Sequence, residues 1–214
     1  MQNTKTGGMM AQWLRWALAA CALCWAAAAT AQVSLPADPN AFVKSAVENV
    51  IKASQADPVA RTGDIEATAK IVEREFLPFT DFARTTRLAV GPAWQKATPE
   101  EREQLVAQFT QLLVHTYAVQ LTQMSGQNVT FSYKPAVVKG NDAVVVAQVK
   151  SGTDVTDVQY RLYKTSAGWR IYDIDMMGMW LIQLYQKQFS TSLANGGIPA
   201  LLKYLTEHNA RFAK

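Results

Sequence analysis

The chain has 214 residues, of which 49% are apolar and 18% are charged, a composition typical of a folded rather than a disordered protein. Its formal net charge is +4, but residues 1–31 hold two of the 21 basic residues and none of the 17 acidic ones. Without that segment the charge falls to +2, which argues against a general nucleic-acid-binding protein.

Residues 1–31 have the organisation of a secretory signal peptide. Lys5 and Arg15 come before an apolar run over 16–29, and the small-residue site Ala29-Thr30-Ala31 follows it. The run is too short for a membrane-spanning helix. We therefore expect a leader over 1–31 that is cleaved after Ala31, followed by a single exported domain over 32–214.

Both cysteines lie in this leader, at Cys21 and Cys24. The exported domain would then contain no disulfide, no thiolate nucleophile and no cysteine-ligated metal. Leu18-Ala19-Ala20-Cys21 also resembles a lipoprotein-processing site. We favour the simple leader, because Arg15 interrupts the apolar segment and mostly apolar residues follow Cys21.

Apolar residues at helical spacing dominate the first half of the domain. The pattern predicts a helix from Asp38-Pro39-Asn40 to Asp57-Pro58 or the turn 61–64, a second helix over 65–75 and a short helix over 81–90 after a break at Pro78. Thr98-Pro99-Glu100-Glu101 is a capping box, which predicts the start of a helix that continues to Gly126. This helix would be about 40 Å long.

The period then changes from helical to alternating. Strands are predicted over 129–133, 143–150, 155–164 and 169–176, and Val137-Val138 leads into a turn over 139–142. Short turns between consecutive strands predict an antiparallel meander. Helix returns after Gly178, breaks at 195–197 and ends near His208. The order predicts an α+β fold in which helices pack on a curved sheet and enclose either solid core or a cavity.

Motifs for catalysis are scarce. His115 and His208 lack the spacing of metal ligands, and no G-x-S-x-G, P-loop or G-x-G-x-x-G motif occurs, so no metal site is expected. Asp173 and Asp175 share one strand face and are either an acid/base pair or a solvated face, of which we favour the second. Arg84 and Arg87 would either share a phosphate or, as we favour, pair with Asp81 or face water.

Methionines gather where the last strand ends. Met176, Met177 and Met179 precede a helix, at the place where the mouth of a cavity would lie. Methionine adapts its shape to varied apolar ligands, although such a cluster is more often plain core. We place Met179 at the mouth and expect Met179→Glu to weaken ligand loading.

A set of motifs extends along most of the domain. The first is Leu77-Pro78-x-x-Asp81-Phe82-x-x-x-Thr86-Arg87-Leu88-Ala89-Val90-Gly91-x-x-Trp94. Others follow in order along the chain, at Thr98-Pro99-Glu100-Glu101, Phe109-x-x-Leu112-Leu113-x-x-Thr116-Tyr117, Val158-x-Tyr160-Arg161-Leu162, Gly168-Trp169-x-Ile171-Tyr172-Asp173-Ile174, Gly178-x-x-Leu181-Ile182, Gln188-Phe189 and Gly196-Gly197-Ile198-x-x-Leu201. Together these motifs resemble the MlaC family of periplasmic phospholipid-binding proteins, also called toluene-tolerance auxiliary components.

This resemblance implies a phospholipid carrier and not an enzyme. The expected fold has an NTF2-like core with a lipid cavity between sheet and helices, and phospholipid is cargo rather than a cofactor. The implied partners are an outer-membrane lipoprotein–porin complex and an inner-membrane ABC transporter with an MCE-domain component. The implied role is to maintain lipid asymmetry of the outer membrane from the periplasm.

The alternating pattern supplies candidate walls for this lipid cavity. We take the inward strand faces and the apolar faces of the helices as lipid-binding residues. They are Leu88, Phe109, Leu113, Tyr117, Val145, Ala147, Val149, Val158, Tyr160, Leu162, Tyr172, Ile174, Met176 and Met179.

Two other functions fit the same pattern. NTF2-like cones also host small-molecule isomerases and hydratases, for which Asp173 or Asp175 would be the base. A chaperone-like periplasmic protein with a solid core would show no change of thermal stability on delipidation, whereas a ligand bound to the native state raises it.

Overall fold

The computed structural model describes residues 35–124, 129–176 and 178–212. The chain separates into residues 1–34 and Leu35–Lys214, and only the second unit is described here. The predicted signal peptide, its cleavage after Ala31, the helix end at Gly126 and Met177 lie outside the described residues.

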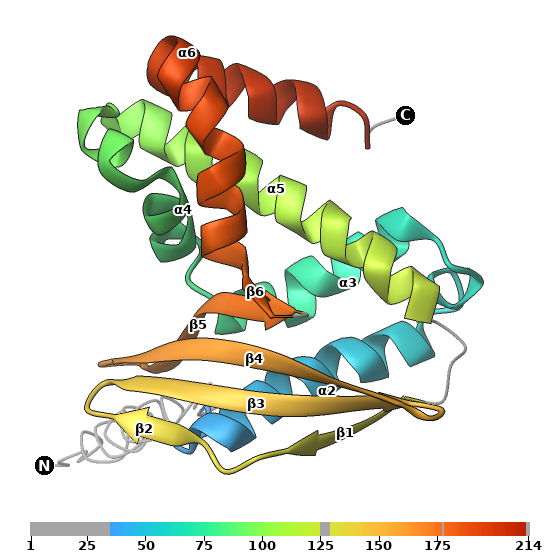
Figure 1. Cartoon of the computed structure of the whole chain (residues 1–214). Coiled ribbons are helices and arrows are strands. Elements are labelled where there is room, and N and C mark those ends of the chain that lie inside the picture. The colour runs from blue at the N-terminus through green and yellow to red at the C-terminus, as the bar shows by residue number, and fades with distance from the viewer. Residues whose placement is uncertain (1–34, 125–128, 177, 213–214) are drawn as a thin grey trace, which may run out of the picture. The chain divides into compact units, whose positions relative to one another are not determined.

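The predicted order of helices followed by strands is confirmed (Figure 1). The helices are α2 (Pro39–Ala56), α3 (Ile65–Glu75), α4 (Phe82–Val90), α5 (Pro99–Met124) and α6 (Leu181–Asn209), with 3-10 turns η1 (Ala60–Thr62), η2 (Leu77–Phe79) and η3 (Gly91–Lys96). The strands are β1 (Val129–Tyr133), β2 (Val137–Lys139), β3 (Asp142–Ser151), β4 (Asp154–Thr165), β5 (Gly168–Met176) and β6 (Met179–Trp180). We expected helix directly after Gly178, whereas the two residues of β6 first pair with β5.

Side-chain caps explain where the helices begin. Asp38, Asp64 and Asp81 each accept a hydrogen bond from the amide three residues later, at 2.8, 2.7 and 2.8 Å. The capping box at the start of α5 is confirmed: the Glu101 amide donates to Thr98 Oγ1 at 3.2 Å and the Thr98 amide donates to Glu101 Oε2 at 2.9 Å. Local sequence therefore sets these four helix starts.

Among the described residues, the strands form one antiparallel sheet in the order β1-β3-β4-β5-β6, with β2 also paired to β3. The register between β4 and β5 shifts at a bulge: Arg161 pairs with Asp173, but Leu162 pairs with Ile171. The helix-covered face therefore carries Ile174 on one side of the bulge and Ile171 on the other. Simple alternation along β5 does not predict this change of face.

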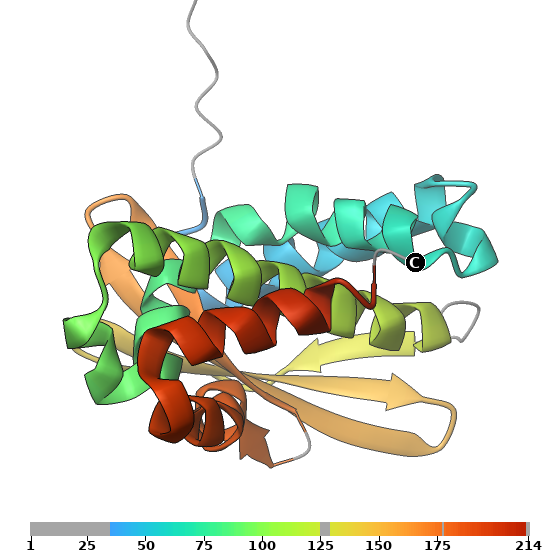
Figure 2. The ribbon, with the colours of Figure 1, turned by 90° about the horizontal axis from the view of Figure 1, so that it is seen from above.

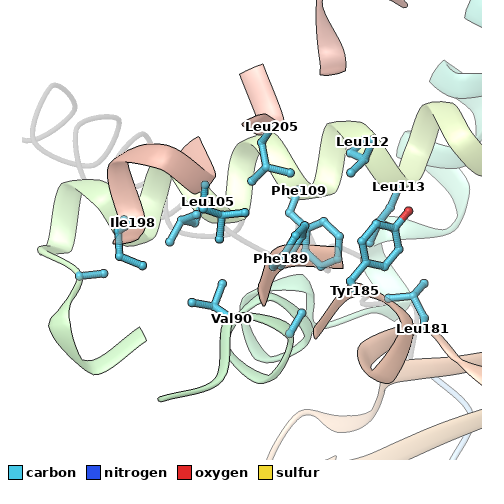
Figure 3. Packing of buried hydrophobic residues seen from close by; sticks show 13 residues of the cluster. Val90, Leu105, Phe109, Leu112, Leu113, Leu181, Tyr185, Phe189, Ile198 and Leu205 are labelled. Carbon is cyan, nitrogen blue, oxygen red and sulfur yellow. The ribbon is translucent and has the colours of Figure 1, made fainter. Parts of the chain in front are cut away.

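Helices cover the sheet unevenly. At one end of the sheet α2 packs directly on the strands, where Phe42, Val43 and Ala46 share a buried cluster with β3, β4 and β5 residues. A second cluster joins α4, α5 and α6, in which the ring of Phe109 lies 4.7 Å from that of Tyr185 and 5.0 Å from that of Phe189 (Figure 3). The later part of α6 runs beside α5 (Figure 2).

The break predicted at 195–197 is a kink inside α6. Gly197 has φ 65° and ψ −150°, a backbone region that essentially only glycine adopts. We expect Gly197→Ala to destabilise the fold by about 2 kcal/mol and to lower Tm by about 5 °C. Thermal unfolding with Ala194→Ser, an exposed change in the same helix, is the comparison. Equal Tm values for Gly197→Ala and the wild type would show that this bend does not require glycine.

Candidate functional site

A cavity of about 500 Å³ lies between the sheet and the helices. This volume is within the range of small-molecule binding sites. The lining is predominantly aliphatic and aromatic, and it comes from both layers. The helices and their connections contribute Val47, Val50, Ile51, Val72, Phe76, Thr80, Phe82, Thr85, Leu113, Val114, Tyr117, Gln120, Leu121 and Leu181; the strands contribute Phe131, Val149, Ser151, Asp154, Thr156, Val158, Tyr160, Ile171, Tyr172, Asp173, Ile174 and Met176.

Exposed polar residues mark one end of the cavity. Gln120 lies near the end of α5, and Asp154 and Thr156 lie at the start of β4; all three are lining residues that face water. The cavity therefore opens to solvent between the end of α5 and the β3–β4 turn. An apolar interior with a polar rim suits an amphiphile whose head group stays hydrated.

Eight of the fourteen residues that we predicted as lipid-binding line this cavity. They are Leu113, Tyr117, Val149, Val158, Tyr160, Tyr172, Ile174 and Met176. Tyr172 lines the cavity, but not as a regular inward residue of β5, because the bulge leaves it without a partner on β4 and its ring lies 6.0 Å from that of Tyr163.

Six predicted residues do not line the cavity. Val145, Ala147 and Leu162 do lie on the helix-covered face, but they are fully buried where α2 packs directly on the sheet. Phe109 fills the cluster between α5 and α6. Leu88 and Met179 are the other two predicted residues that are absent from the lining.

These last two residues lie elsewhere for separate reasons. Leu88 is half-buried on α4, where its carbonyl accepts a hydrogen bond from Gln186 Nε2 at 2.9 Å. Met179 is 52% exposed on β6. A charge at Met179 is therefore no longer expected to oppose ligand entry.

Many of the lining residues that we did not predict from the sequence belong to helices. Val47, Val50 and Ile51 of α2 were visible as an apolar stripe in the sequence, but the stripe does not tell which of its residues face a void. Val72 and Leu121 are similar cases. Each helix has a packed part and a cavity-facing part, and only the tertiary arrangement separates the two.

Asp173 lies at the closed end of the cavity and corrects the expectation of a solvated strand face. It is 2% exposed and Asp175 is 3% exposed. Asp173 Oδ1 accepts from the amides of Ile182 at 3.0 Å and Ile174 at 3.1 Å, and its Oδ2 accepts from Arg161 Nη1 at 3.1 Å. Burial raises the pKa of Asp173, and these hydrogen bonds oppose that effect.

The two aspartates organise the start of α6. Trp180, the residue before this helix, offers no side-chain cap, so Asp173 takes that role from a neighbouring strand through the Ile182 amide. Asp175 Oδ1 accepts from the Gly178 amide at 2.8 Å in the preceding turn. Arg161 completes the arrangement, with its guanidinium carbon 3.7 Å from the centroid of the Trp180 ring. Their geometry is that of structural acceptors and not of a free general base.

Two further observations concern the described ranges only. Within them, no group of three or more His, Cys, Asp and Glu side chains is placed to hold a metal ion. No helix in the described part of the chain has the length and apolarity needed to cross a membrane.

Comparison with known proteins agrees with this cavity. A solved structure of a phospholipid-binding protein from Ralstonia solanacearum, in complex with a phospholipid, is 36% identical in sequence with a TM-score of 0.78, and the match covers 83% of this chain and 100% of that one. The intermembrane phospholipid transport system binding protein MlaC of Haemophilus influenzae is 20% identical over 168 residues, which are 77% of this chain and 78% of that protein. The sequence pattern of the MlaC protein matches residues 44–207, so the chain belongs to the MlaC family.

Proposed function

We propose that this protein carries phospholipid, with the acyl chains enclosed in the cavity and the head group at its open end. The observation that supports the proposal most directly is the apolar cavity of about 500 Å³ in a chain 36% identical to a protein whose structure holds a phospholipid. Carriage of phospholipid as cargo requires no catalytic group and no cofactor.

Physical chemistry sets what such a carrier must do. Moving about 30 acyl methylenes out of water yields about 24 kcal/mol, more than the 18–21 kcal/mol at which known affinities stop. The relevant comparison is therefore between the cavity and a bilayer. Both are apolar, so the free energies of transferring the acyl chains from water into each of them nearly cancel. A carrier whose free energy of lipid binding lies within a few kcal/mol of that of a membrane leaflet loads and unloads lipid reversibly.

The route of the lipid is part of the proposal. Family membership, together with a signal-peptide pattern over 1–31, supports a periplasmic protein that starts at Gln32. We propose that it carries phospholipid between an outer-membrane lipoprotein–porin complex and an inner-membrane ABC transporter with an MCE-domain component, and so maintains lipid asymmetry. An isomerase or hydratase with Asp173 as base is disfavoured, because both oxygens of that carboxylate already accept hydrogen bonds.

Native mass spectrometry of protein purified from the periplasm without detergent tests the proposal. We expect a complex whose extra mass equals that of a diacyl phospholipid, and the mass of the chain shows whether it begins at Gln32. Removal of the lipid by organic extraction and refolding should lower Tm, because a ligand bound only to the native state stabilises it. A lipid-free spectrum together with an unchanged Tm would contradict carriage.

A further inference from the structure

Arg84, on the first turn of α4, is held between aromatic rings of β4 and β5. Its guanidinium carbon lies 4.2 Å from the centroid of the Tyr163 ring and 4.4 Å from that of Tyr172. The two rings are edge-to-face, 6.0 Å apart, so the cation touches both faces at once. We call Arg84, Tyr163 and Tyr172 the Arg84 corner.

The guanidinium of this corner has no polar partner among the residues that the structure describes. Its Nε atom is buried without a hydrogen bond, and no carboxylate of the described chain forms an ion pair with it. The nearby Asp81 is already engaged, because its Oδ1 caps α4 and its Oδ2 accepts the Tyr163 hydroxyl. Because Nε is buried, an incoming acceptor would meet the two Nη groups, which are not buried and have no hydrogen-bond partner among the described residues. A charge-assisted hydrogen bond to them would be favourable.

Other arginines with aromatic neighbours are satisfied. Arg161 stacks on Trp180 and pairs with Asp173, and Arg102 lies over Trp94 and donates to two backbone carbonyls, at 3.2 and 3.4 Å. Arg84 has the same stacking without the acceptor. The contrast marks it as a preordered donor and not as an ordinary structural arginine.

The surroundings of the corner are basic. Arg87, which is exposed, lies three residues further along α4, and Arg170 is the direct partner of Tyr163 in the β4–β5 register. Arg170 donates to the Trp169 carbonyl through one nitrogen. On the other side of Tyr163, exposed Asp142 is its partner in the β3–β4 register. The patch therefore has three guanidinium groups beside two carboxylates, of which Asp81 is already engaged.

We propose that the Arg84 corner is a docking site for a protein partner that presents an Asp or Glu side chain to Arg84. Arginine and tyrosine are enriched among the interface residues that dominate binding, and a guanidinium binds a carboxylate through paired hydrogen bonds. A membrane surface is the weaker match, since electrostatic lipid recognition uses clusters of four to eight mobile basic residues. The inference rests on the proposed function for the choice of partner complexes.

The corner is well placed for docking that leaves the cavity mouth free. Thr85, beside Arg84, donates to the Tyr172 carbonyl at 2.7 Å, and Thr85 and Tyr172 both line the cavity away from its opening. Figure 1 shows α4 on the opposite side of this unit from the end of α5, where the mouth lies. A partner held by the corner would not obstruct lipid at the mouth.

Binding to the two membrane complexes of the host bacterium tests the proposal. Lipid-loaded wild type, Arg84→Gln and Arg61→Gln are titrated against the purified lipoprotein–porin complex and the purified transporter, both in nanodiscs. Arg61 is an exposed residue of η1, so Arg61→Gln controls for the loss of one charge. We expect Arg84→Gln to weaken at least one complex about 30-fold or more, while Arg61→Gln, lipid content and Tm stay unchanged.

Other outcomes overturn the proposal. Unchanged affinities for both complexes would do so, and so would an equal loss in Arg61→Gln. Weaker co-sedimentation of Arg84→Gln with phosphatidylglycerol vesicles, without a change toward either complex, would assign the corner to lipid head groups instead. If Arg84→Gln lowers Tm, Arg87→Gln on the exposed part of the patch takes its place, and an unchanged affinity there counts against the proposal. Wild type without bound lipid that still binds a complex through Arg84 would refute carriage but not docking.

Discussion

Replacing Asp173 with alanine is expected to lower the free energy of unfolding by about 3 kcal/mol. The substitution removes the acceptor of the Ile182 amide at the start of α6 and of the Ile174 amide. A buried amide without an acceptor is no longer compensated for its desolvation, which costs about 1–3 kcal/mol. The lost ion pair adds less, because the Arg161 side chain is 35% exposed and water can hydrate it. For a chain of this size the Tm should fall by about 10 °C, and urea unfolding gives the free energy directly.

Asp157→Ala is the matched control. Asp157 lies on β4 and pairs with Lys134 at 2.6 Å, but the side chains of Asp157 and Lys134 are 39% and 47% exposed. Exposed ion pairs contribute little, so Asp157→Ala should leave Tm almost unchanged. Asp173→Asn keeps an oxygen for the Ile182 amide and should recover part of the loss. Equal effects of Asp173→Ala and Asp157→Ala would contradict the capping role of Asp173.

Local signals made the fold readable from the sequence. The capping box at Thr98 and Glu101 and the glycines at 196–197 act within a few residues, and the structure has a helix start and a kink at these positions. The bulge between Arg161 and Leu162 left no such signal, because residues on both sides of it still alternate. It is a property of pairing between strands, and it explains why Tyr172 was expected among the inward residues. Asp173 does lie on the face opposite Ile174, and it is buried because the start of α6 covers that face and donates the Ile182 amide to it.

The cavity was harder to predict than the fold. Alternation gives the face of a strand but not the position along it where helix cover ends, so Val145 and Val149 look equivalent although α2 packs on the first and the second faces the cavity. The Arg84 corner also depends on contacts between elements that are distant in the sequence. Tyr163 and Tyr172 are joined only by the β4–β5 pairing, and neither residue indicates an arginine site in the sequence.

Filling the cavity should abolish lipid loading without unfolding the chain. Val158 lies on the cavity face of β4, opposite Ala147 and Met176, and its side chain is half-buried. A tryptophan there takes the space of several acyl methylenes. Excluding about four of them costs about 3 kcal/mol relative to a bilayer, which is about a 200-fold loss of loading. Native mass spectrometry of Val158→Trp should therefore show mostly lipid-free protein.

Val146→Trp is the control that distinguishes filling of the cavity from the introduction of a large side chain elsewhere on the sheet. Val146 is also half-buried, on β3, but it lies opposite Gln159 and does not line the cavity. It should keep wild-type lipid content, as should Met179→Glu at the exposed side chain of β6. Normal lipid loading of a folded Val158→Trp variant would mean that the acyl chains lie elsewhere. An acyl chain and the indole ring cannot occupy the same volume between β4 and α5.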